Sequence, residues 1–196
     1  MYDNWSISDF QYDIYIYILA RFWLPANSSP PKIGHSNFAP KLFVFAAIWS
    51  SGRSKIIIKS GDFRLNHQNY IKFILPSLIK DLKQGFKNHR RAILQQDNAP
   101  AHRAGPTQQF IAANFTDFIS PAQWPAHSPD LNPCDYFLWG YLKERVFARR
   151  YTTLSGLRRA IRSEYDSIPQ EFITNSINAW RNRLSDCVAF RGDTFE

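Results

Sequence analysis

The sequence predicts a single α/β domain in which helices flank a mixed β-sheet. Short apolar runs, of the length typical of buried strands, recur along the chain up to residue 119. Apolar residues at helical spacing follow these runs and continue to the C-terminus. Hydrophobic residues make up 44% of the 196 residues, which is enough for one core of ordinary size and argues against disorder throughout.

The first predicted strands lie within the first 60 residues. Residues 5–19 alternate loosely and are rich in Ile and Tyr, which indicates a strand or a hairpin. Residues 26–40 contain three prolines and are expected to form a loop. The apolar run 42–49 is typical of a strand covered on both faces. After a turn at 50–53, the three isoleucines of 55–59 predict the returning strand of a hairpin.

The next element is predicted to be a helix that begins after Asn66, a suitable N-cap. Its buried face is predicted from four apolar residues at i, i+4 spacing: Tyr70, Ile74, Leu78 and Leu82. Pro76 should kink or split this helix, because proline lacks the backbone N–H and clashes with the preceding turn.

A strand at 91–96, a helix at 102–114 and a short strand at 118–119 follow. Three strands, a helix, a strand, a helix and a strand are the order of an RNase H-like fold, with a mixed five-stranded sheet. The C-terminal part is predicted to be helical. Asn132 and Pro133 fit the N-cap and first position of a helix that ends near residue 147.

Two more helices are predicted from apolar residues at helical spacing. The first carries the stripe Leu154, Leu157, Ile161 and Tyr165. The second, at about 170–187, should turn four residues inward: Phe172, Ile173, Ile177 and Trp180. The sequence has no repeat and no clear linker, so residues 1–196 are expected to form one domain.

Asp97 is the first candidate functional residue, because it ends the apolar strand 91–96. Ligand-binding groups lie at the carboxyl ends of strands in open α/β sheets. Asp residues are also common at the start of turns, and Asn98 and Pro100 indicate a turn here. A second acidic stretch downstream, which contains Asp130 and Asp135, favours the functional interpretation. Asp135 could alternatively complement the dipole of the helix that it begins.

The chain resembles the catalytic core of mariner-type transposases, members of the DDE/D superfamily of cut-and-paste transposases. The resemblance rests on QQDNAPAH at residues 95–102, followed by SPDLNP at 128–133 and DYFLW at 135–139. Together, in this order and at this separation, the motifs are highly specific. The similarity is good over residues 33–196 and poor over the first 30.

The resemblance implies a catalytic set of three aspartates. Asp97 matches the second and Asp135 the third, with 37 residues between them, close to the usual family spacing. Asp130 is a rival for the third position, but the family pattern places the catalytic residue after the proline-containing turn. The first is expected to be Asp9, although Phe10 stands where Glu is usual. The alternatives to Asp9 are Asp13 and Asp3.

His102 also matches a family position near the second aspartate. A role in capping the following helix and a direct catalytic role are both open at this stage. Asn98 is expected to shape the turn, and the aromatic residues Phe137 and Trp139 are expected to belong to the core.

The three aspartates suit metal-dependent phosphodiester chemistry. The attacking oxygen must be activated and the charge on the leaving oxygen neutralised, and two divalent metals about 3.5–4 Å apart do both. Mg²⁺ prefers carboxylate oxygens and water. The resemblance therefore implies that Asp9, Asp97 and Asp135 hold Mg²⁺ or Mn²⁺, with two ions as the expected number.

DNA is the expected partner. Lys and Arg outnumber Asp and Glu by 24 to 16, a net charge of +8 that favours a polyanion. Basic residues of the C-terminal helices could contact phosphates: Lys143, Arg145, Arg149, Arg150, Arg158, Arg159 and Arg162. The resemblance further implies action in the nucleus and a possible homodimer on paired DNA ends. A membrane and a small-molecule substrate are not expected, and the apolar run 14–20 is too short to span a bilayer.

Two functions are compatible with these motifs. Mariner-type transposases begin with helix-turn-helix modules, and there is no room for them before residue 9, so these modules are expected to be absent. The first interpretation is a transposase catalytic domain that cleaves DNA by hydrolysis and then joins the DNA end to target DNA, by attack of the 3′-hydroxyl on a target phosphodiester. The alternative is a catalytically inactive relic, or a co-opted nucleic-acid-binding protein, with the same fold.

Overall fold

The computed structural model describes residues 15–16, 20–23, 41–60, 62–87, 89–125 and 128–190. Its strands are β1 (Tyr15–Ile16), β2 (Ala20–Trp23), β3 (Lys41–Phe45), β4 (Ile48–Trp49), β5 (Gly52–Arg53), β6 (Ile57–Ser60), β7 (Ile93–Leu94) and β8 (Asp117–Phe118). Its helices are α1 (His67–Asn69), α2 (Leu75–Gly85), α3 (Pro100–Arg103), α4 (Gly105–Asn114), α5 (Trp139–Phe147), α6 (Leu154–Asp166) and α7 (Gln170–Ala189).

The strands form parallel and antiparallel ladders. β3 pairs antiparallel with β2 on one side and with β6 on the other. β7 pairs parallel with β1 and with β8. The described strands form two three-stranded sheets, with the orders β2–β3–β6 and β1–β7–β8, and a two-stranded sheet of β4 and β5. Parallel and antiparallel pairs both occur, as in the mixed sheet that was predicted.

The run 42–49 was predicted to be one strand, but β3 ends at Phe45 and β4 resumes at Ile48. Between them, the backbone N–H of Ala47 bonds to the hydroxyl of Ser54 at 2.9 Å, and the carbonyl of Ala47 accepts from the N–H of Ser54 at 2.8 Å. A side chain thus replaces one rung of the ladder. β5 lies within the segment that was predicted to be only a turn.

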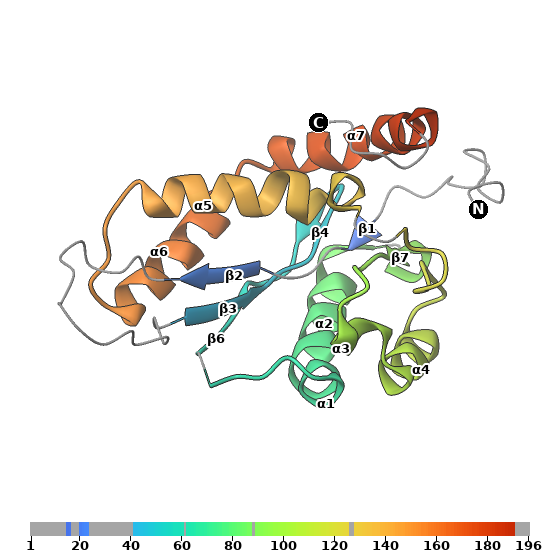
Figure 1. Ribbon diagram of the computed structural model, residues 1–196, viewed down its shortest axis with the longest axis horizontal. Coiled ribbons are helices and arrows are strands. Elements are labelled where there is room, and N and C mark those ends of the chain that lie inside the picture. The colour runs from blue at the N-terminus through green and yellow to red at the C-terminus, as the bar shows by residue number, and fades with distance from the viewer. Residues whose placement is uncertain are drawn as a thin grey trace.

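Two apolar layers cover the two faces of the sheet, as alternation along the strands requires. Leu42 and Val44 of β3 belong to one cluster, together with residues of α5, α6 and α7. Phe43 and Phe45 belong to the other, with residues of α2 and α4. Figure 1 shows α5 to α7 on one side of the strands and α1 to α4 on the other. The prediction of a strand covered on both faces is confirmed.

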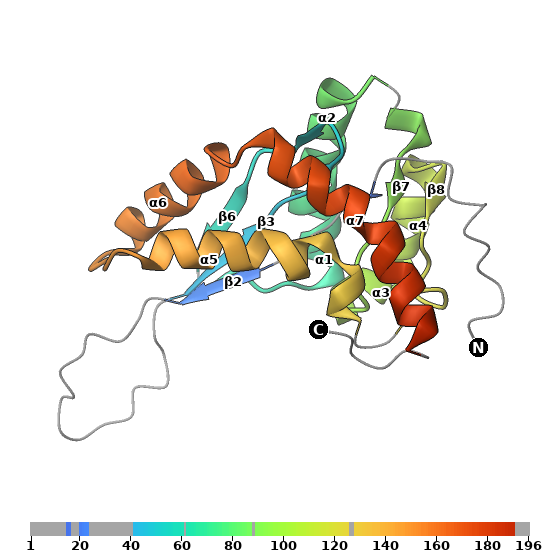
Figure 2. The ribbon, with the colours of Figure 1, turned by 90° about the horizontal axis from the view of Figure 1, so that it is seen from above.

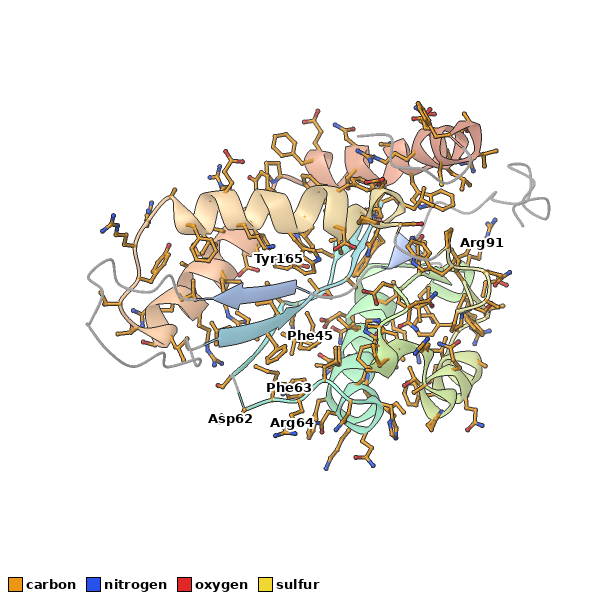
Figure 3. All side chains as sticks on the ribbon, in the orientation of Figure 1. Phe45, Asp62, Phe63, Arg64, Arg91 and Tyr165 are labelled. Carbon is orange, nitrogen blue, oxygen red and sulfur yellow. The ribbon has the colours of Figure 1, made fainter. Side chains whose placement is uncertain are left out.

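The view from above follows α7 from the end of α6 across the molecule toward the side of α3 (Figure 2). With all side chains drawn, Phe45 points to the α1 and α2 side and Tyr165 lies on the opposite side of the strands (Figure 3). The ring of Phe45 meets the ring of Phe63 edge-on, with centroids 5.7 Å apart. The core therefore sits in two layers, with the sheet between them.

The helix predicted after Asn66 is split, as expected from Pro76. The side chain of Asn66 accepts from the N–H of Asn69, which confirms the N-cap. A π-helical segment, Tyr70–Ile74, joins α1 to α2, and Pro76 lies in the first turn of α2. All four residues predicted for its inner face are buried: Tyr70, Ile74, Leu78 and Leu82.

The helix predicted at 102–114 is also two helices. The backbone of Ala104 leaves the helical region, with ψ of 136°, so α3 ends at Arg103 and α4 begins at Gly105. Pro106 has no N–H to donate to the carbonyl of His102, and the side chain of Gln108 donates there instead, at 2.8 Å.

The C-terminal helices agree with the prediction except at one residue. Leu157, Ile161 and Tyr165 of α6 are fully buried. In α7, Ile173, Ile177 and Trp180 face inward, but Phe172 is 44% exposed and meets only the edge of Tyr141, at 6.1 Å between ring centroids. The prediction that Phe172 faces the core was wrong, because the helix presents residue 173 rather than 172 to the sheet.

Two further findings concern the described part of the chain. Both cysteines, Cys134 and Cys187, are free and buried, as the low cysteine count predicted. Among the residues that the structure describes, none of the helices combines the length and the apolar composition needed to cross a bilayer.

Candidate functional site

The candidate site is built at the carboxyl end of β7. Beyond Leu94 the chain continues as Gln95 and Gln96, both buried, which point to opposite faces. The amide of Gln95 donates to the carbonyl of Leu131 at 2.9 Å. Gln96 accepts from the hydroxyl of Tyr70, also at 2.9 Å. These two bonds fix the end of the strand on both sides before it reaches Asp97.

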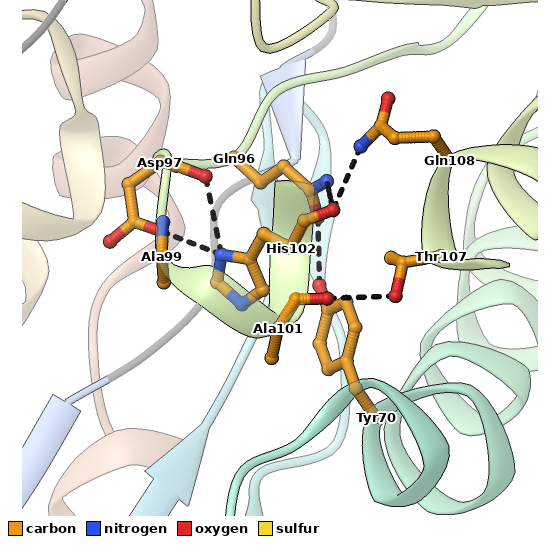
Figure 4. Close-up of polar contacts among 8 residues, drawn as sticks. All are labelled: Tyr70, Gln96, Asp97, Ala99, Ala101, His102, Thr107 and Gln108. Atoms are coloured by element: carbon orange, nitrogen blue, oxygen red, sulfur yellow. Dashed lines mark hydrogen bonds and ion pairs between the residues drawn. The ribbon is translucent and has the colours of Figure 1, made fainter. Parts of the chain in front are cut away.

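The carboxylate of Asp97 is held by the turn that follows it. Its Oδ1 accepts from the backbone N–H of Ala99 at 3.1 Å and lies 2.6 Å from Nδ1 of His102 (Figure 4). Asn98 donates to the carbonyls of Pro121 and Trp124, at 3.2 and 3.4 Å, and so ties the turn to the loop after β8. The role in turn shape that the sequence predicted for Asn98 is confirmed.

His102 lies within α3, and not at the start of the longer helix as predicted. Its side chain is fully buried, whereas the side chain of Asp97 is 40% exposed. The imidazole packs against the ring of Tyr70, with centroids 4.6 Å apart. The side chain therefore contacts the candidate catalytic carboxylate and does not cap a helix.

Asp135 is delivered by the second motif. The carbonyl of Leu131 accepts from Gln95 and from the indole N–H of Trp180, each at 2.9 Å, so the loop is anchored to β7 and α7. Asn132 caps the next turn, since its Oδ1 accepts from the N–H of Cys134 at 3.1 Å. The helix begins as a π-helical segment, Cys134–Leu138, before α5.

The two aspartates line one open groove of about 490 Å³. Its lining residues are Asp97, Asn98, Ala99, Arg103, Trp124, Ser128, Pro129 and Asp135. Asp130 does not line this groove. Its backbone carbonyl accepts from Arg183 at 3.2 Å, and its charge acts on Cys187 and raises the pKa of that thiol together with burial. The structure thus brings Asp97 and Asp135 together and places Asp130 outside their groove.

The pKa values of the two carboxyl groups are shifted in opposite directions. Loss of solvation raises the pKa of Asp97, but the hydrogen bonds from His102 and Ala99 outweigh it, so the pKa lies below its usual value. Partial burial and the charge of Asp97 raise the pKa of Asp135 to about 6, against smaller opposite effects of Asn132 and Lys143. The residue as a whole is exposed, but its carboxyl group faces the groove. Two neighbouring carboxylates therefore leave surplus negative charge in the groove.

Arg103 is a groove residue that sequence reasoning missed, although it directly follows the first motif. Of the predicted phosphate contacts, Lys143 is exposed and close enough to lower the pKa of Asp135. Arg145 instead pairs with Glu164 at 2.9 Å. Arg158 donates to the carbonyl of Ile58 and to Ser60, so it holds α6 to β6. Trp139 is buried, as predicted.

The expected first aspartate, Asp9, lies outside the described residues, as do Asp13 and Asp3. In the described ranges, no three His, Cys, Asp or Glu side chains form a metal-ligand cluster. β1 and β7 run parallel, and Asp9 precedes β1 in sequence while Asp97 follows β7. A contact between them requires the chain before Tyr15 to turn back toward the groove, so the assignment of Asp9 stays a prediction.

Comparisons with known proteins agree with these motifs. A family model described as DDE superfamily endonuclease matches residues 20–158. The Tc3 transposase of Caenorhabditis elegans is 26% identical over 176 residues, which are 88% of this chain and 51% of that protein. The chain thus spans about half the length of this relative.

Solved structures show the same fold. A Mos1 transposase paired-end complex with the left transposon end has a TM-score of 0.80 at 19% identity, and the match covers 97% of this chain and 60% of that chain. The Mos1 mariner paired-end complex with Mn has a TM-score of 0.75 at 21% identity, and the match covers 93% and 56%. Since the family model spans well over half of the sequence, the chain belongs to the DDE superfamily of endonucleases, and its relatives are transposases of the Tc1/mariner type.

Proposed function

We propose that this chain is a transposase catalytic domain that hydrolyses DNA phosphodiester bonds and transfers DNA strands with divalent metal ions. One observation carries the proposal: Asp97 and Asp135, 37 residues apart in sequence, line one groove. The carboxylate of Asp97 is held by the buried side chain of His102, and the loop before Asp135 is anchored at Leu131 by Gln95 and Trp180. Such a preorganised pair is the core of a phosphoryl-transfer site.

The donor set fits a divalent cation. Both groups are carboxylates, which Mg²⁺ and Mn²⁺ accept as ligands, and partial burial together with the charge of Asp97 raises the pKa of Asp135. Asp97 and Asp135 would hold the metal, with Asp9 as the proposed third ligand. A bound pair of ions would activate the attacking oxygen and neutralise the leaving oxygen. The Mn in a related Mos1 structure supports this assignment.

The reaction has two chemical steps. In the first, the oxygen of water forms a bond to phosphorus, and the bond from phosphorus to the 3′-oxygen breaks, which releases a 3′-hydroxyl and a 5′-phosphate. In the second, this 3′-hydroxyl attacks a phosphodiester of the target DNA. One P–O bond forms as another breaks, so the second step needs no energy source. Asp97 stays in place in both steps, because its supporting contact comes from the buried side chain of His102.

DNA is the substrate that the charges of the site fit. Arg103 lines the groove and Lys143 lies close to Asp135, so cations border the carboxylates on two sides. Such cations would contact phosphates on either side of the scissile bond. The paired-end and transposon-end complexes of Mos1 support DNA as the partner. A homodimer on paired DNA ends is the proposed working form. The nucleus is the proposed place of action.

The test is Mn²⁺ binding by calorimetry, followed by Mn²⁺-dependent nicking of supercoiled plasmid. We expect the wild-type chain to bind Mn²⁺ and nick DNA, and Asp97→Ala and Asp135→Ala to lose both, because each variant removes a metal ligand. Asp117→Ala is the matched control, since Asp117 is exposed and begins β8, away from the groove.

Wild-type protein that binds no Mn²⁺ and does not nick DNA would contradict the proposal. DNA binding that persists without Mn²⁺ binding would instead support the non-catalytic, DNA-binding alternative.

A further inference from the structure

The imidazole of His102 is an unusual group to find fully buried. Its Nδ1 meets Asp97, but its Nε2 has no hydrogen-bond partner among the described residues. Burying a polar nitrogen without a partner costs stability. Among the described residues, Nε1 of Trp49 and Nε1 of Trp139 are also buried without a partner, but His102 differs from them because its other ring nitrogen contacts a candidate metal ligand, Asp97. This difference points to a role for the Nδ1 contact.

The contact with His102 makes the two carboxylate oxygens of Asp97 unequal. An ionised carboxylate only accepts hydrogen bonds, so Nδ1 of His102 carries the hydrogen. Oδ1 accepts from His102 at 2.6 Å and from the N–H of Ala99 at 3.1 Å. Within the described part of the chain, Oδ2 receives no hydrogen bond. Oδ1 is therefore occupied by protein donors, and Oδ2 is left for a cation.

His102 is itself held in place from three sides. The ring of Tyr70 lies 4.6 Å away, tilted by 39°. The hydroxyl of Tyr70 is fixed by Gln96. The backbone carbonyl of His102 accepts from Gln108 at 2.8 Å and, more weakly, from Gln96 at 3.5 Å. Figure 4 shows the bonds of Gln96 and Gln108 meeting at the backbone carbonyl of His102. The backbone of His102 is thereby fixed, and its ring is packed against Tyr70.

We propose that His102 is a positioning residue for metal binding: its Nδ1–H fixes Asp97 so that Oδ2 alone is presented to a divalent cation in the groove. The inference rests on the proposed function, and it names a residue that acts through Asp97 and not on the DNA. Partners of metal ligands in the outer shell commonly contribute about 10–100-fold to metal affinity, which sets the size of the expected effect.

The first experiment compares His102→Leu with His102→Asn by Mn²⁺ calorimetry, with thermal unfolding as the check of folding. Leucine fills the space without a donor, and we expect Mn²⁺ affinity to fall about 10–100-fold. The side-chain nitrogen of asparagine takes the place of Nδ1, so His102→Asn should restore affinity to within about threefold of wild type. A folded His102→Leu protein with wild-type affinity would overturn the inference, as would His102→Asn binding as weakly as His102→Leu.

The second experiment needs no metal and no His102 variant. In a ¹⁵N-labelled protein, a buried and hydrogen-bonded imidazole N–H exchanges slowly and gives a downfield proton resonance. We expect this resonance in the wild-type chain and its loss or upfield shift in Asp97→Ala. A resonance unchanged by Asp97→Ala would overturn the inference whatever the metal does. Absence of Mn²⁺ binding in wild-type protein would instead overturn the proposed function, and the role of His102 with it.

Discussion

The side-chain amide of Gln95 donates to the backbone carbonyl of Leu131 at 2.9 Å, across 36 residues of sequence. The bond joins the end of β7, which carries Asp97, to the loop that leads to Asp135. The same carbonyl accepts from Trp180 of α7. The separation of the two candidate catalytic carboxylates is therefore set by buried hydrogen bonds and not by the groove surface.

Replacing Gln95 by alanine should loosen this connection. We expect Gln95→Ala to lower the free energy of unfolding by about 1–3 kcal/mol, because a buried hydrogen-bonding group is removed. Mn²⁺ affinity should fall as well, since the loop before Asp135 loses one of its two anchors. Urea denaturation followed by tryptophan fluorescence and Mn²⁺ calorimetry measure the two effects. Gln109→Ala, at an exposed position of α4, should change stability by less than about 0.5 kcal/mol.

Asp135 predicts a pH dependence. Its pKa in the fold is raised from 3.8 to about 6, so the folded state takes up a proton more readily than the unfolded chain. The resulting stabilisation is fully present below the unfolded value and is lost as the pH rises through about 6. Metal-free Asp135→Asn should therefore be more stable than wild type at about pH 8, and this advantage should shrink as the pH falls through about 6 and vanish only below the unfolded value of 3.8.

Protonation of Asp135 competes with the binding of a metal ion to its carboxylate. Below the pKa of Asp135, Mn²⁺ affinity should rise about tenfold per pH unit, because each metal bound releases one proton, and it should level off above. Calorimetry across this range is the measurement, and Asp117→Asn, at an exposed position, is the control. Urea midpoints of wild type and Asp135→Asn that move in parallel with pH would contradict the raised pKa.

Replacement of Arg53 is expected to lower the stability of the fold, and this effect is independent of the groove. Its guanidinium donates to the carbonyl of Tyr165 at 2.6 Å and to that of Ile168 at 2.5 Å, so it caps the end of α6 with two bonds. Lysine keeps the charge but has no planar fork. Arg53→Lys should lower stability by about 1–3 kcal/mol in urea denaturation. An equal loss in Arg159→Lys, at an exposed position of α6, would show that the fork is not the cause.

The assignment of Asp9 as the third metal ligand can be tested against its two alternatives, Asp13 and Asp3. We expect Asp9→Ala to abolish Mn²⁺ binding as Asp97→Ala does, and Asp13→Ala and Asp3→Ala to bind as wild type. The physical reason is that a third carboxylate is needed to hold two ions near the pair already in the groove. Calorimetry on the three variants decides the matter, and loss of binding in Asp13→Ala alone would move the assignment to Asp13.

The sequence was informative wherever the physics is local. The order of strands and helices follows from apolar runs and helical spacing, and the inner faces of α2 and α6 were predicted residue by residue. Turn chemistry, which depends on a few neighbouring residues, placed Asp97 after a strand and Asp135 after a proline turn. The split at Pro76 was predicted because proline removes a backbone donor wherever it stands.

The predicted element boundaries were wrong where a side chain takes a hydrogen bond that the backbone of a regular strand or helix would make. β3 is interrupted because the hydroxyl of Ser54 takes a backbone bond of Ala47. The helix at 102–114 is broken at Ala104, and the side chain of Gln108 serves the carbonyl that is left free. In α7, Ile173, Ile177 and Trp180 stand at i, i+4 and i+7 and so share one face, whereas Phe172 lies about 100° from Ile173 around the helix, and strict helical spacing would have excluded Phe172 from the inner face.

By itself, the sequence determined the family, the fold class and two of the acidic residues, because these depend on which residues follow one another. Only the tertiary structure decided that Asp97 and Asp135 share a groove, that Asp130 lies outside it and that Arg103 lines it. It also decided that His102 is buried against Asp97. These outcomes depend on bonds such as Gln95 to Leu131, whose partners are chosen by packing between elements far apart in the chain.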